Sequence, residues 1–274
     1  MTKVSVIIAA YNCQDSIGLA LNSIISQDYQ DWECIICDDG STDDTWERII
    51  KITLNNEKFT VLKNKFNLGI AVTLNRCINI AKGEYIAIQD ADDFSEKERL
   101  TELVDFLDNN SDVSVVGSYA YLFDKNGRRW GELKPPLNPR IEDWLRGFFI
   151  IHASSLMRRK DIIEAGRYDA NYKRVQDYDL WLNLIYKGYK IVTMPGILYN
   201  VRWDVGDYSR RKLKYRMIEA KIIYKGLKKL NAHAWNYIYI IKTMLSGMLH
   251  PQIMHLYYLY RFGRKQNKRI LKKV

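Results

Sequence analysis

Short apolar runs alternate with stretches of helical period along the first part of the chain. The runs are rich in β-branched and aromatic residues and stop at turn-forming or acidic residues, as buried strands do; they cover residues 4–10, 32–37, 59–62 and 85–88. Apolar residues at helical spacing follow the first three runs, over residues 17–25, 46–50 and 70–81. Strands that alternate with helices favour a parallel sheet with right-handed crossovers. The pattern therefore predicts an α/β fold with a mostly parallel central sheet flanked by helices.

Polar residues, most of them acidic, follow three of these strands where each strand ends. They are Tyr11 and Asn12 after the first, Asp38 and Asp39 after the second, and Asp90, Asp92 and Asp93 after the fourth. Parallel strands present their carboxyl ends at one rim, where open α/β sheets bind ligands. Carboxylates there can hold a divalent cation that bridges a diphosphate, and Mg²⁺ or Mn²⁺ suits such oxygen ligands. An isolated Asp-x-Asp is more often a turn or helix cap, so the other motifs must decide between the two interpretations.

The middle of the chain is less regular. Residues 113–123 alternate like a strand and run into a turn at 124–127, which predicts a hairpin. The remaining expected elements are a helix over 141–149, a strand over 149–157, an amphipathic helix from Gln176, and strands over 191–194 and 196–202.

Charge divides the chain into two unequal parts. The 274 residues carry a net charge of +10. Residues 211–274 hold 16 Lys or Arg and one acid, Glu219, whereas residues 1–210 hold 26 basic and 31 acidic residues. We therefore expect an acidic domain over 1–210 and a basic, aromatic-rich helical tail over 211–274.

Cysteine usage and the start of the chain indicate the compartment. The four cysteines are too few and too scattered for a disulfide framework. Cys34 and Cys37 form a C-x-x-C, but residues three apart on a strand point to opposite faces, so we interpret both as packed thiols. Met1 leads directly into a strand-like run without the long apolar segment of a secretory signal, and we expect the main domain to stay in the cytoplasm.

The tail combines apolar faces with clusters of basic residues. Residues 211–230 have a helical pattern whose apolar face comprises Leu213, Met217, Ile218, Ile222 and Leu227. Residues 231–260 are rich in Tyr and carry one formal charge, Lys242, but Gly247 and Pro251 interrupt them, so they match a spanning helix poorly. An amphipathic segment on an anionic membrane surface explains this composition, since each basic residue there contributes about 1 kcal/mol. The alternative is a helical subdomain that packs its aromatic residues on the core.

Several motifs, in order, resemble the inverting family 2 glycosyltransferases of the GT-A fold. The opening strand is similar to that family's first strand, with Ala10 where a proline is common. The sequence Asp-Asp-Gly-Ser-Thr-Asp from Asp38 resembles its nucleoside-binding motif, and Asp-Ala-Asp-Asp from Asp90 resembles its metal motif. Gln-Asp-Tyr-Asp-Leu-Trp from Gln176 is similar to the motif that carries its catalytic base. The resemblance covers about residues 3–210 and implies a Rossmann-like GT-A domain with a helical C-terminal extension.

The resemblance implies a role for each matched acid. Asp39, or its neighbour Asp38, would accept a hydrogen bond from the imide N–H of uracil or thymine. Asp90 would contact the ribose, and Asp92 would bind the Mn²⁺ or Mg²⁺ that neutralises the departing nucleoside diphosphate. Asp177 would act as general base and take the proton of the acceptor hydroxyl, which attacks the anomeric carbon opposite the leaving phosphate. A single displacement of this kind inverts the anomeric centre.

Other matched positions complete the expected site. Contacts with the nucleotide sugar are implied for Ala10, Tyr11, Asn12, Asn67, Gly69, Ala91 and Arg202. The guanidinium of Arg202 suits a diphosphate, with a surface salt bridge as an equal alternative. We interpret Asp179 and Trp181 as structural first, with a place beside the acceptor pocket as the alternative. His152 is a candidate for the wall of the sugar pocket, although a lone histidine is more often packed or hydrogen-bonded.

These motifs predict a metal-dependent inverting glycosyltransferase. The donor would be a UDP-sugar, or a dTDP-sugar, and the acceptor a glycan or a lipid-linked glycan in bacterial surface polysaccharide synthesis, such as O-antigen or capsule. The tail suggests a peripheral protein on the inner face of the membrane. One alternative is nucleic-acid binding through the basic, tyrosine-rich tail; no RNA-binding signature is present, so no nucleic acid is expected. The other is a glycan-binding relative without activity, which the complete set of acids disfavours.

Overall fold

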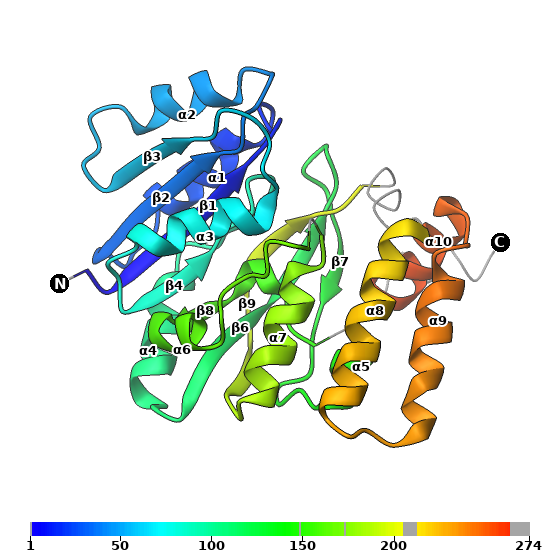
Figure 1. The fold of residues 1–274 in the computed structure, drawn as a ribbon. Helices are drawn as coiled ribbons and strands as arrows, with labels where there is room; N and C mark the ends of the chain where they lie inside the picture. The colour runs from blue at the N-terminus through cyan, green and yellow to red at the C-terminus, as the bar shows by residue number, and fades with distance from the viewer. Residues whose placement is uncertain (1, 148, 173, 205–212, 264–274) are drawn as a thin grey trace.

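The computed structural model describes residues 2–147, 149–172, 174–204 and 213–263, which form a central sheet with helices on both faces (Figure 1). The helices are α1 (Ile17–Ile25), α2 (Thr45–Thr53), α3 (Ile70–Ile80), α4 (Arg99–Asn109), α5 (Ile141–Leu145), α6 (Arg159–Glu164), α7 (Gln176–Tyr186), α8 (Leu213–Lys229), α9 (Ile238–Ser246) and α10 (Pro251–Phe262), with short 3-10 turns η1 (His152–Ser154) and η3 (Ala234–Tyr237). The strands are β1 (Val4–Ala10), β2 (Trp32–Asp38), β3 (Phe59–Lys63), β4 (Tyr85–Ile88), β5 (Phe94–Ser95), β6 (Val113–Phe123), β7 (Arg129–Leu133), β8 (Leu156–Arg158) and β9 (Lys190–Arg202).

The nine strands of the described chain form one mixed sheet. Their order is β3-β2-β1-β4-β8-β6-β9-β5, and β7 pairs with β6. Strands β1 to β4 pair in parallel, as the alternation of strands and helices predicts. Strand β8 is antiparallel to both of its neighbours, and β6 and β7 form the predicted hairpin. The first four strands therefore place their carboxyl ends along one rim of the sheet.

The core lies on both faces of this sheet because successive side chains of a strand point to opposite sides. On β1, Ile7 packs in one cluster with α3 and α7, whereas Val6 and Ile8 pack in the other with α1 and α4. All three side chains are fully buried. Burial on both faces explains why the parallel strands read as continuous apolar runs rather than as alternating ones.

The predicted strand over residues 149–157 is only partly correct. The chain forms the turn η1 before the short strand β8 begins at Leu156. Two serine hydroxyls bond the backbone here: Ser154 Oγ donates to the Ile151 carbonyl at 2.9 Å, and Ser155 Oγ donates to the His152 carbonyl at 2.6 Å. Such local bonds close a turn and compete with a sheet ladder. The two runs predicted at 191–194 and 196–202 are instead one strand, β9, with irregular register against β6.

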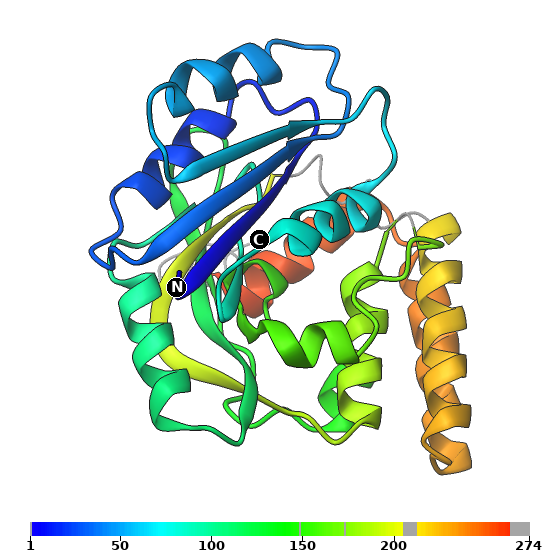
Figure 2. The same cartoon turned by 60° about the vertical axis from the view of Figure 1, so that its left-hand side comes forward.

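Helices α8 and α9 of the tail pack against the part of the chain that forms the sheet, through the contact of α8 with α7. Figures 1 and 2 show α8 beside α7, with α9 on the far side of α8. Ile222, Ile223 and Leu227 of α8 are buried in the same cluster as Leu180 and Trp181 of α7. The apolar face predicted for residues 211–230 is therefore partly core. Among the described residues, none of the helices is long and apolar enough to cross a bilayer.

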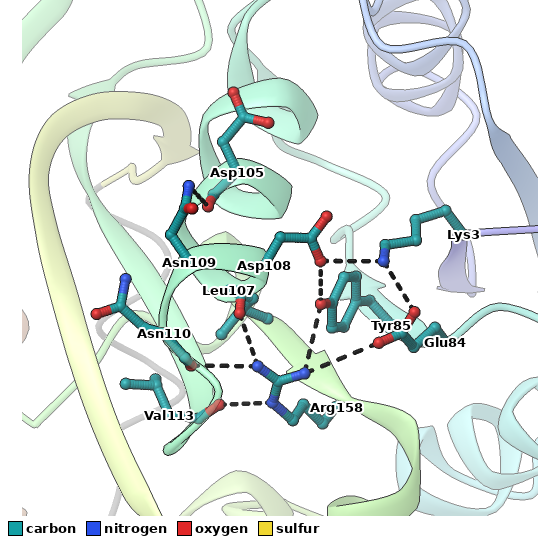
Figure 3. Close-up of polar contacts among 10 residues, drawn as sticks. All are labelled: Lys3, Glu84, Tyr85, Asp105, Leu107, Asp108, Asn109, Asn110, Val113 and Arg158. Carbon is teal, nitrogen blue, oxygen red and sulfur yellow. Dashed lines mark hydrogen bonds and ion pairs between the residues drawn. The ribbon is translucent and has the colours of Figure 1, made fainter.

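A cluster of paired polar groups closes the amino end of β4 (Figure 3). This amino-end cluster comprises Lys3, Glu84, Tyr85, Asp108 and Arg158. Lys3 Nζ lies 2.8 Å from Glu84 and 3.0 Å from Asp108, and the Tyr85 hydroxyl donates to Asp108 at 2.5 Å. Arg158 donates to the carbonyls of Leu107 at 2.7 Å and Val113 at 2.8 Å, which ties the end of α4 to the start of β6.

Candidate active site

The loops after β1 and β2 are hydrogen-bonded to each other at the rim. The Ala10 carbonyl accepts a bond of 2.7 Å from the Asp39 amide, and the Asn12 amide donates to Ser41 Oγ at 3.0 Å. Asn12 has a φ of +46°, a left-handed conformation that asparagine tolerates. Ala10 is buried, whereas the adjacent Tyr11 is 47% exposed. An aromatic ring therefore stands in solvent beside the two linked loops.

Asp39 holds a third loop against the same rim. Its buried carboxylate accepts bonds from Asn64 Nδ2 at 2.6 Å and from the amides of Leu68 and Gly69, each at 2.9 Å. Gly69, at the start of α3, has a φ of +94°, and the neighbouring Asn67 is exposed. A carboxylate offers about four acceptor positions, and these contacts use three of them.

Asp38 stabilises the turn that carries Asp39. Its fully buried carboxylate accepts bonds from the Ser41 amide, at 3.3 Å, and from the Ser41 hydroxyl. Gly40 follows with a φ of +71°, and a Cβ there would lie 2.7 Å from the Phe66 backbone. Only glycine allows the loops after β2 and β3 to approach this closely. The acidic motif after β2 therefore holds the loops after β1, β2 and β3 together through hydrogen bonds.

Three carboxyl groups gather at the end of β4. The potential ligand oxygens of Asp90, Asp92 and Asp93 all lie within 4.8 Å of one another, and we call these residues the acid cluster. Burial raises the pKa of Asp93 well above its usual range, and the charges of Asp92 and Asp90 raise it further. Asp90 and Asp92 are partly exposed, while Ala91 between them is buried. This set of hard oxygen donors with like charge matches the preference of a divalent cation.

The acid cluster lies close to the loop after β1. Burial raises the pKa of the Cys13 thiol to about 12, and the Asp92 charge adds to the rise. The structure thus brings Asp92 together with the loop that contains Tyr11 and Asn12, as expected for side chains at one rim.

A buried polar network holds the acid cluster from below. The Tyr199 hydroxyl donates to Asp93 and accepts bonds from the Asp90 amide at 3.1 Å and from Gln89 Nε2 at 3.0 Å. Arg99, which is fully buried, places its guanidinium 4.8 Å from the Tyr199 ring centroid and donates to the Ile88 carbonyl at 2.6 Å. Burial lowers the pKa of Arg99 to about 10, so the group stays cationic at neutral pH beneath three acids.

Arg202 joins this network from the end of β9. Its backbone amide donates to Asp93 Oδ1 at 2.7 Å, and its side chain forms an ion pair of 3.2 Å with Asp204. The guanidinium is partly exposed. Arg202 therefore lies next to the acid cluster, and the surface ion pair weighed from the sequence is also present.

A second set of site residues lies at the start of α7. His152 Nε2 is 2.7 Å from the Tyr168 hydroxyl, and the His152 ring packs edge-on against Trp181 at 5.8 Å. Burial lowers the pKa of His152, while the partly exposed Asp177 carboxylate opposes the shift. Burial also raises the pKa of Tyr168, and both Asp177 and Asp90 add to that rise. The Tyr168 hydroxyl thus lies within electrostatic reach of both acid sites.

Asp179, two residues after Asp177 and therefore on the other side of α7, contacts different partners. It is almost fully buried, and its carboxylate pairs with Lys225 of α8 at 2.8 Å and accepts a bond from Asn183 at 3.0 Å. These contacts fasten α8 to α7. The sequence interpretation that favoured a structural role agrees with this geometry.

Sequence reasoning missed Arg99, Tyr168 and Tyr199. Each is buried and acts through partners that are distant in the chain; the Tyr199 hydroxyl, for example, meets an amide 109 positions away. Arg99 follows the acid cluster at the first turn of α4, where an arginine normally indicates an exposed helix face. Its position close after the acids was the one available signal.

The central sheet and its flanking helices have the fold of known GT-A structures. Among solved structures, S. aureus TarS 1–349 in complex with UDP-GlcNAc superposes with a TM-score of 0.67 at 19% identity, covering 90% of this chain and 71% of TarS 1–349. The mannosyltransferase PcManGT from Pyrobaculum calidifontis, in complex with GDP-Man and Mn²⁺, gives a TM-score of 0.67 at 17% identity, covering 99% and 79%. At such identities the likeness establishes the fold alone.

The chain belongs to glycosyl transferase family 2, whose family model matches residues 5–166. It is 34% identical over 260 residues to the putative glycosyltransferase EpsE of Bacillus subtilis, covering 93% of each chain. It is 32% identical over 248 residues to the Escherichia coli protein named UDP-Glc:alpha-D-GlcNAc-diphosphoundecaprenol beta-1,3-glucosyltransferase WfaP, covering 90% of this chain and 96% of WfaP. The protein is therefore a glycosyltransferase.

Proposed function

We propose that the protein catalyses metal-dependent, inverting transfer of a sugar from a UDP-sugar, or a dTDP-sugar, to a lipid-linked or other glycan acceptor. The observation that carries this proposal is the acid cluster at the end of β4, where ligand oxygens of Asp90, Asp92 and Asp93 lie within 4.8 Å of one another. In the proposal, the donor is held at this cluster and the acceptor at Asp177. The names of relatives and structural neighbours support a nucleotide-sugar donor, since they include UDP-Glc, UDP-GlcNAc and GDP-Man.

The linked loops after β1, β2 and β3 would hold the nucleoside. Ala10, Tyr11, Asn12, Asn67 and Gly69 border this region. The carboxylate of Asp39 retains one acceptor position after its three internal bonds, and an imide N–H of uracil or thymine can donate to it. Asp38 supports this geometry through Ser41. Both pyrimidines present the same imide edge, so this contact favours UDP and dTDP equally.

The acid cluster would hold a divalent cation, with Asp92 as the principal ligand and Asp90 beside the ribose. When bound, Mn²⁺ or Mg²⁺ supplies positive charge that stabilises the departing diphosphate. Arg202 lies next to the cluster and would add a guanidinium to the same phosphates. Tyr199 keeps its proton because its pKa is raised by burial and by Asp93 and Asp90, so it can hold Asp93 in place as a donor.

Asp177 would accept the proton of the acceptor hydroxyl as that oxygen attacks the anomeric carbon. Its carboxylate is partly exposed at the first turn of α7, so a hydroxyl of the acceptor can reach it from solvent. His152 stays neutral at pH 7 because burial lowers its pKa, so it competes with the base neither by charge nor by an ion pair. Trp181 packs against His152 and fixes one wall of this pocket.

We infer that the acceptor is met at a membrane. The name of WfaP specifies a diphosphoundecaprenol-linked acceptor, and residues 211–274 of this chain are strongly basic. In this proposal residues 1–210 form the catalytic domain and residues 211–274 meet an anionic membrane surface on its cytoplasmic side. The product would enter a bacterial surface polysaccharide such as O-antigen or capsule.

Calorimetry and thermal shift with UDP, dTDP, GDP and CMP, each with and without Mn²⁺, test the donor site. We expect UDP or dTDP to bind the wild-type protein only with Mn²⁺, and Asp92→Ala to abolish this binding. The matched control is Asp112→Ala, which removes an exposed carboxylate paired with Lys190. Asp112 precedes β6, and two strands, β4 and β8, lie between β6 and β1 in the sheet. Nucleotide binding that is absent, or that Asp92→Ala leaves unchanged, would contradict the proposal.

A further inference from the structure

The outward sides of α9 and α10 expose an unusual number of large apolar side chains. On α9, Ile238, Ile241 and Leu245 recur at helical spacing, and on α10 Ile253 and Leu256 continue the pattern, with Met248 between the helices. Each of these six side chains is more than half exposed. We call them the outer face. Apolar residues at such spacing normally face a core, so this face lacks a cover within the described part of the chain.

The same tail shows what a covered helix looks like. On α8 the apolar residues Ile222 and Leu227 are buried against α7. Gly226 permits the close approach, since a Cβ there would lie 2.7 Å from the Trp144 ring. The ion pair between Lys225 and Asp179 completes the contact. Helix α8 is therefore fixed against α7. Helix α9 packs on the other side of α8, so its exposed apolar residues lie on the side away from α7 (Figure 1).

Helix α10 packs on β7 and on Trp203, which follows the last residue of β9. Tyr258 stacks on Trp203 with ring centroids 5.8 Å apart and planes 5° from parallel. Trp203 is the residue after Arg202, whose amide bonds Asp93. At the other end of the contact, Gly263 forms a bridge with Gly131 of β7. The outer face is thus held in a fixed position relative to the catalytic rim.

Charge selects the partner of this face. The sequence from residue 220 to residue 274 contains 12 Lys or Arg and no acidic side chain. Lys242 and Arg261 lie on α9 and α10 themselves and are exposed. A second copy of the chain would bring like charge against like charge. Tyr257 and Tyr260 of α10 are also exposed, and tyrosine is common at membrane interfaces because its ring is apolar and its hydroxyl is polar. Aliphatic groups bordered by cations match an anionic bilayer, where the apolar groups enter the interface and the cations meet phosphate headgroups.

We propose that the outer face of α9 and α10 is the surface by which the protein docks on an anionic lipid bilayer, with α8 fixed against α7. This proposal specifies the membrane contact of the proposed function and rests on it for its purpose, because the Trp203–Tyr258 stack would keep the acid cluster beside the docked surface. It also excludes Ile222 and Leu227 of α8 from membrane contact, since both side chains are buried in the core.

The experiment is vesicle flotation with the full-length chain. The vesicles contain phosphatidylcholine alone or phosphatidylcholine with phosphatidylglycerol. Ile241→Glu/Leu245→Glu places two carboxylates on the outer face, and its matched control, Leu19→Glu/Leu54→Glu, makes the same changes at exposed positions of α1 and at the end of α2. We expect wild type and control to bind the anionic vesicles and the α9 variant to bind them at least about tenfold more weakly. Lys242→Glu, a second variant, should also bind more weakly, and only where phosphatidylglycerol is present.

Melting temperature and Mn²⁺-dependent UDP binding, both measured without vesicles, show that each variant is folded. They also separate the two proposals, because nucleotide binding can fail while docking persists and the reverse. The docking proposal is wrong if the wild-type protein does not bind anionic vesicles, or if the α9 variant binds them as strongly as wild type. A dimer that the α9 variant dissociates, or RNA binding that it abolishes, would assign the outer face to another partner and overturn it equally.

Discussion

The two ends of strand β4 gather charged groups in opposite ways. At the amino end, two acids and two cations are paired, and hydrogen bonds from Tyr85 and Lys3 outweigh burial and lower the pKa of Asp108 (Figure 3). At the carboxyl end, three acids lie together, and burial with the charges of Asp92 and Asp90 raises the pKa of Asp93. The amino-end cluster is complete as it stands. The acid cluster instead places three carboxyl groups within 4.8 Å of one another.

The largest effect we expect is on kcat. It should distinguish Asp177, the proposed general base, from Asp108, an acid in the amino-end cluster. Asp177→Asn should lower kcat by about 10²–10⁴-fold, because the acceptor hydroxyl loses its general base. Binding of UDP with Mn²⁺ should be unchanged. Asp108→Asn, the same chemical change in the amino-end cluster, should leave kcat near the wild-type value. Steady-state transfer assays with both variants measure this, and equal losses of kcat would show that the comparison of the two ends has no functional meaning.

The next effect concerns stability and ligand together. Asp92→Asn removes a negative charge that raises the pKa of Asp93, so the metal-free protein should melt at a higher temperature in EDTA. Wild type should gain about 2.7 kcal/mol from UDP and Mn²⁺ at a hundred times the dissociation constant. The variant should gain none of it. Denaturant unfolding with and without the ligands measures both quantities, and a variant less stable than wild type in EDTA would mean that the cluster carries no repulsion.

A smaller loss is expected from the amino end, and there it should affect folding alone. Arg158→Met leaves the carbonyls of Leu107 and Val113 without their donor and should cost about 2–3 kcal/mol of unfolding free energy. The kcat per folded molecule should not change. Lys160→Met, an exposed neighbour, is the control and should change stability by less than about 0.5 kcal/mol. A selective fall in kcat for Arg158→Met would link the two ends of the strand.

The smallest effect is a pH dependence. Asp108 has a lowered pKa in the folded protein, so its pairing stabilises the fold above the unfolded pKa of about 3.9 and is lost as the pH falls through the folded value. Asp108→Asn should therefore cost at most about 1 kcal/mol at pH 7, discounted for partial exposure, and nothing near pH 2. Denaturant unfolding at both pH values measures the difference. A cost that is equal at both would assign it to packing instead of charge.

The pattern of apolar and polar residues along the chain was sufficient to predict where the strands of the rim end and where α7 begins. The apolar runs of β1, β2 and β4 end where Asn12, Asp38 and Asp90 were expected, because a strand buried on both faces must be continuous and must stop at polar residues. The motif at Asp177 was likewise placed at a helix start. A rim of parallel strands then brings these positions together without further information.

Contacts between distant segments were beyond that reach. The bond between Asn75 and Tyr168 joins residues 93 positions apart, and the pair of Asp179 and Lys225 spans 46. Nothing in the local sequence distinguishes Ile222 and Leu227 of α8, which are buried, from Ile241 and Leu245 of α9, which are exposed. Burial of an amphipathic face is decided by which surface the chain meets, and periodicity does not encode that surface.

Helix α3 touches both halves of the site within three turns. Its first residue follows Gly69, whose amide is bound by Asp39, and Asn75 on the same helix bonds the backbone N–H and carbonyl of Tyr168. A short helix held at two points transmits a displacement as a rigid rod. The loop after β3 and Tyr168 are therefore held in fixed positions by the folded chain. If the loop binds the nucleoside as proposed, the entropy of ordering it is lost during folding and not at each turnover.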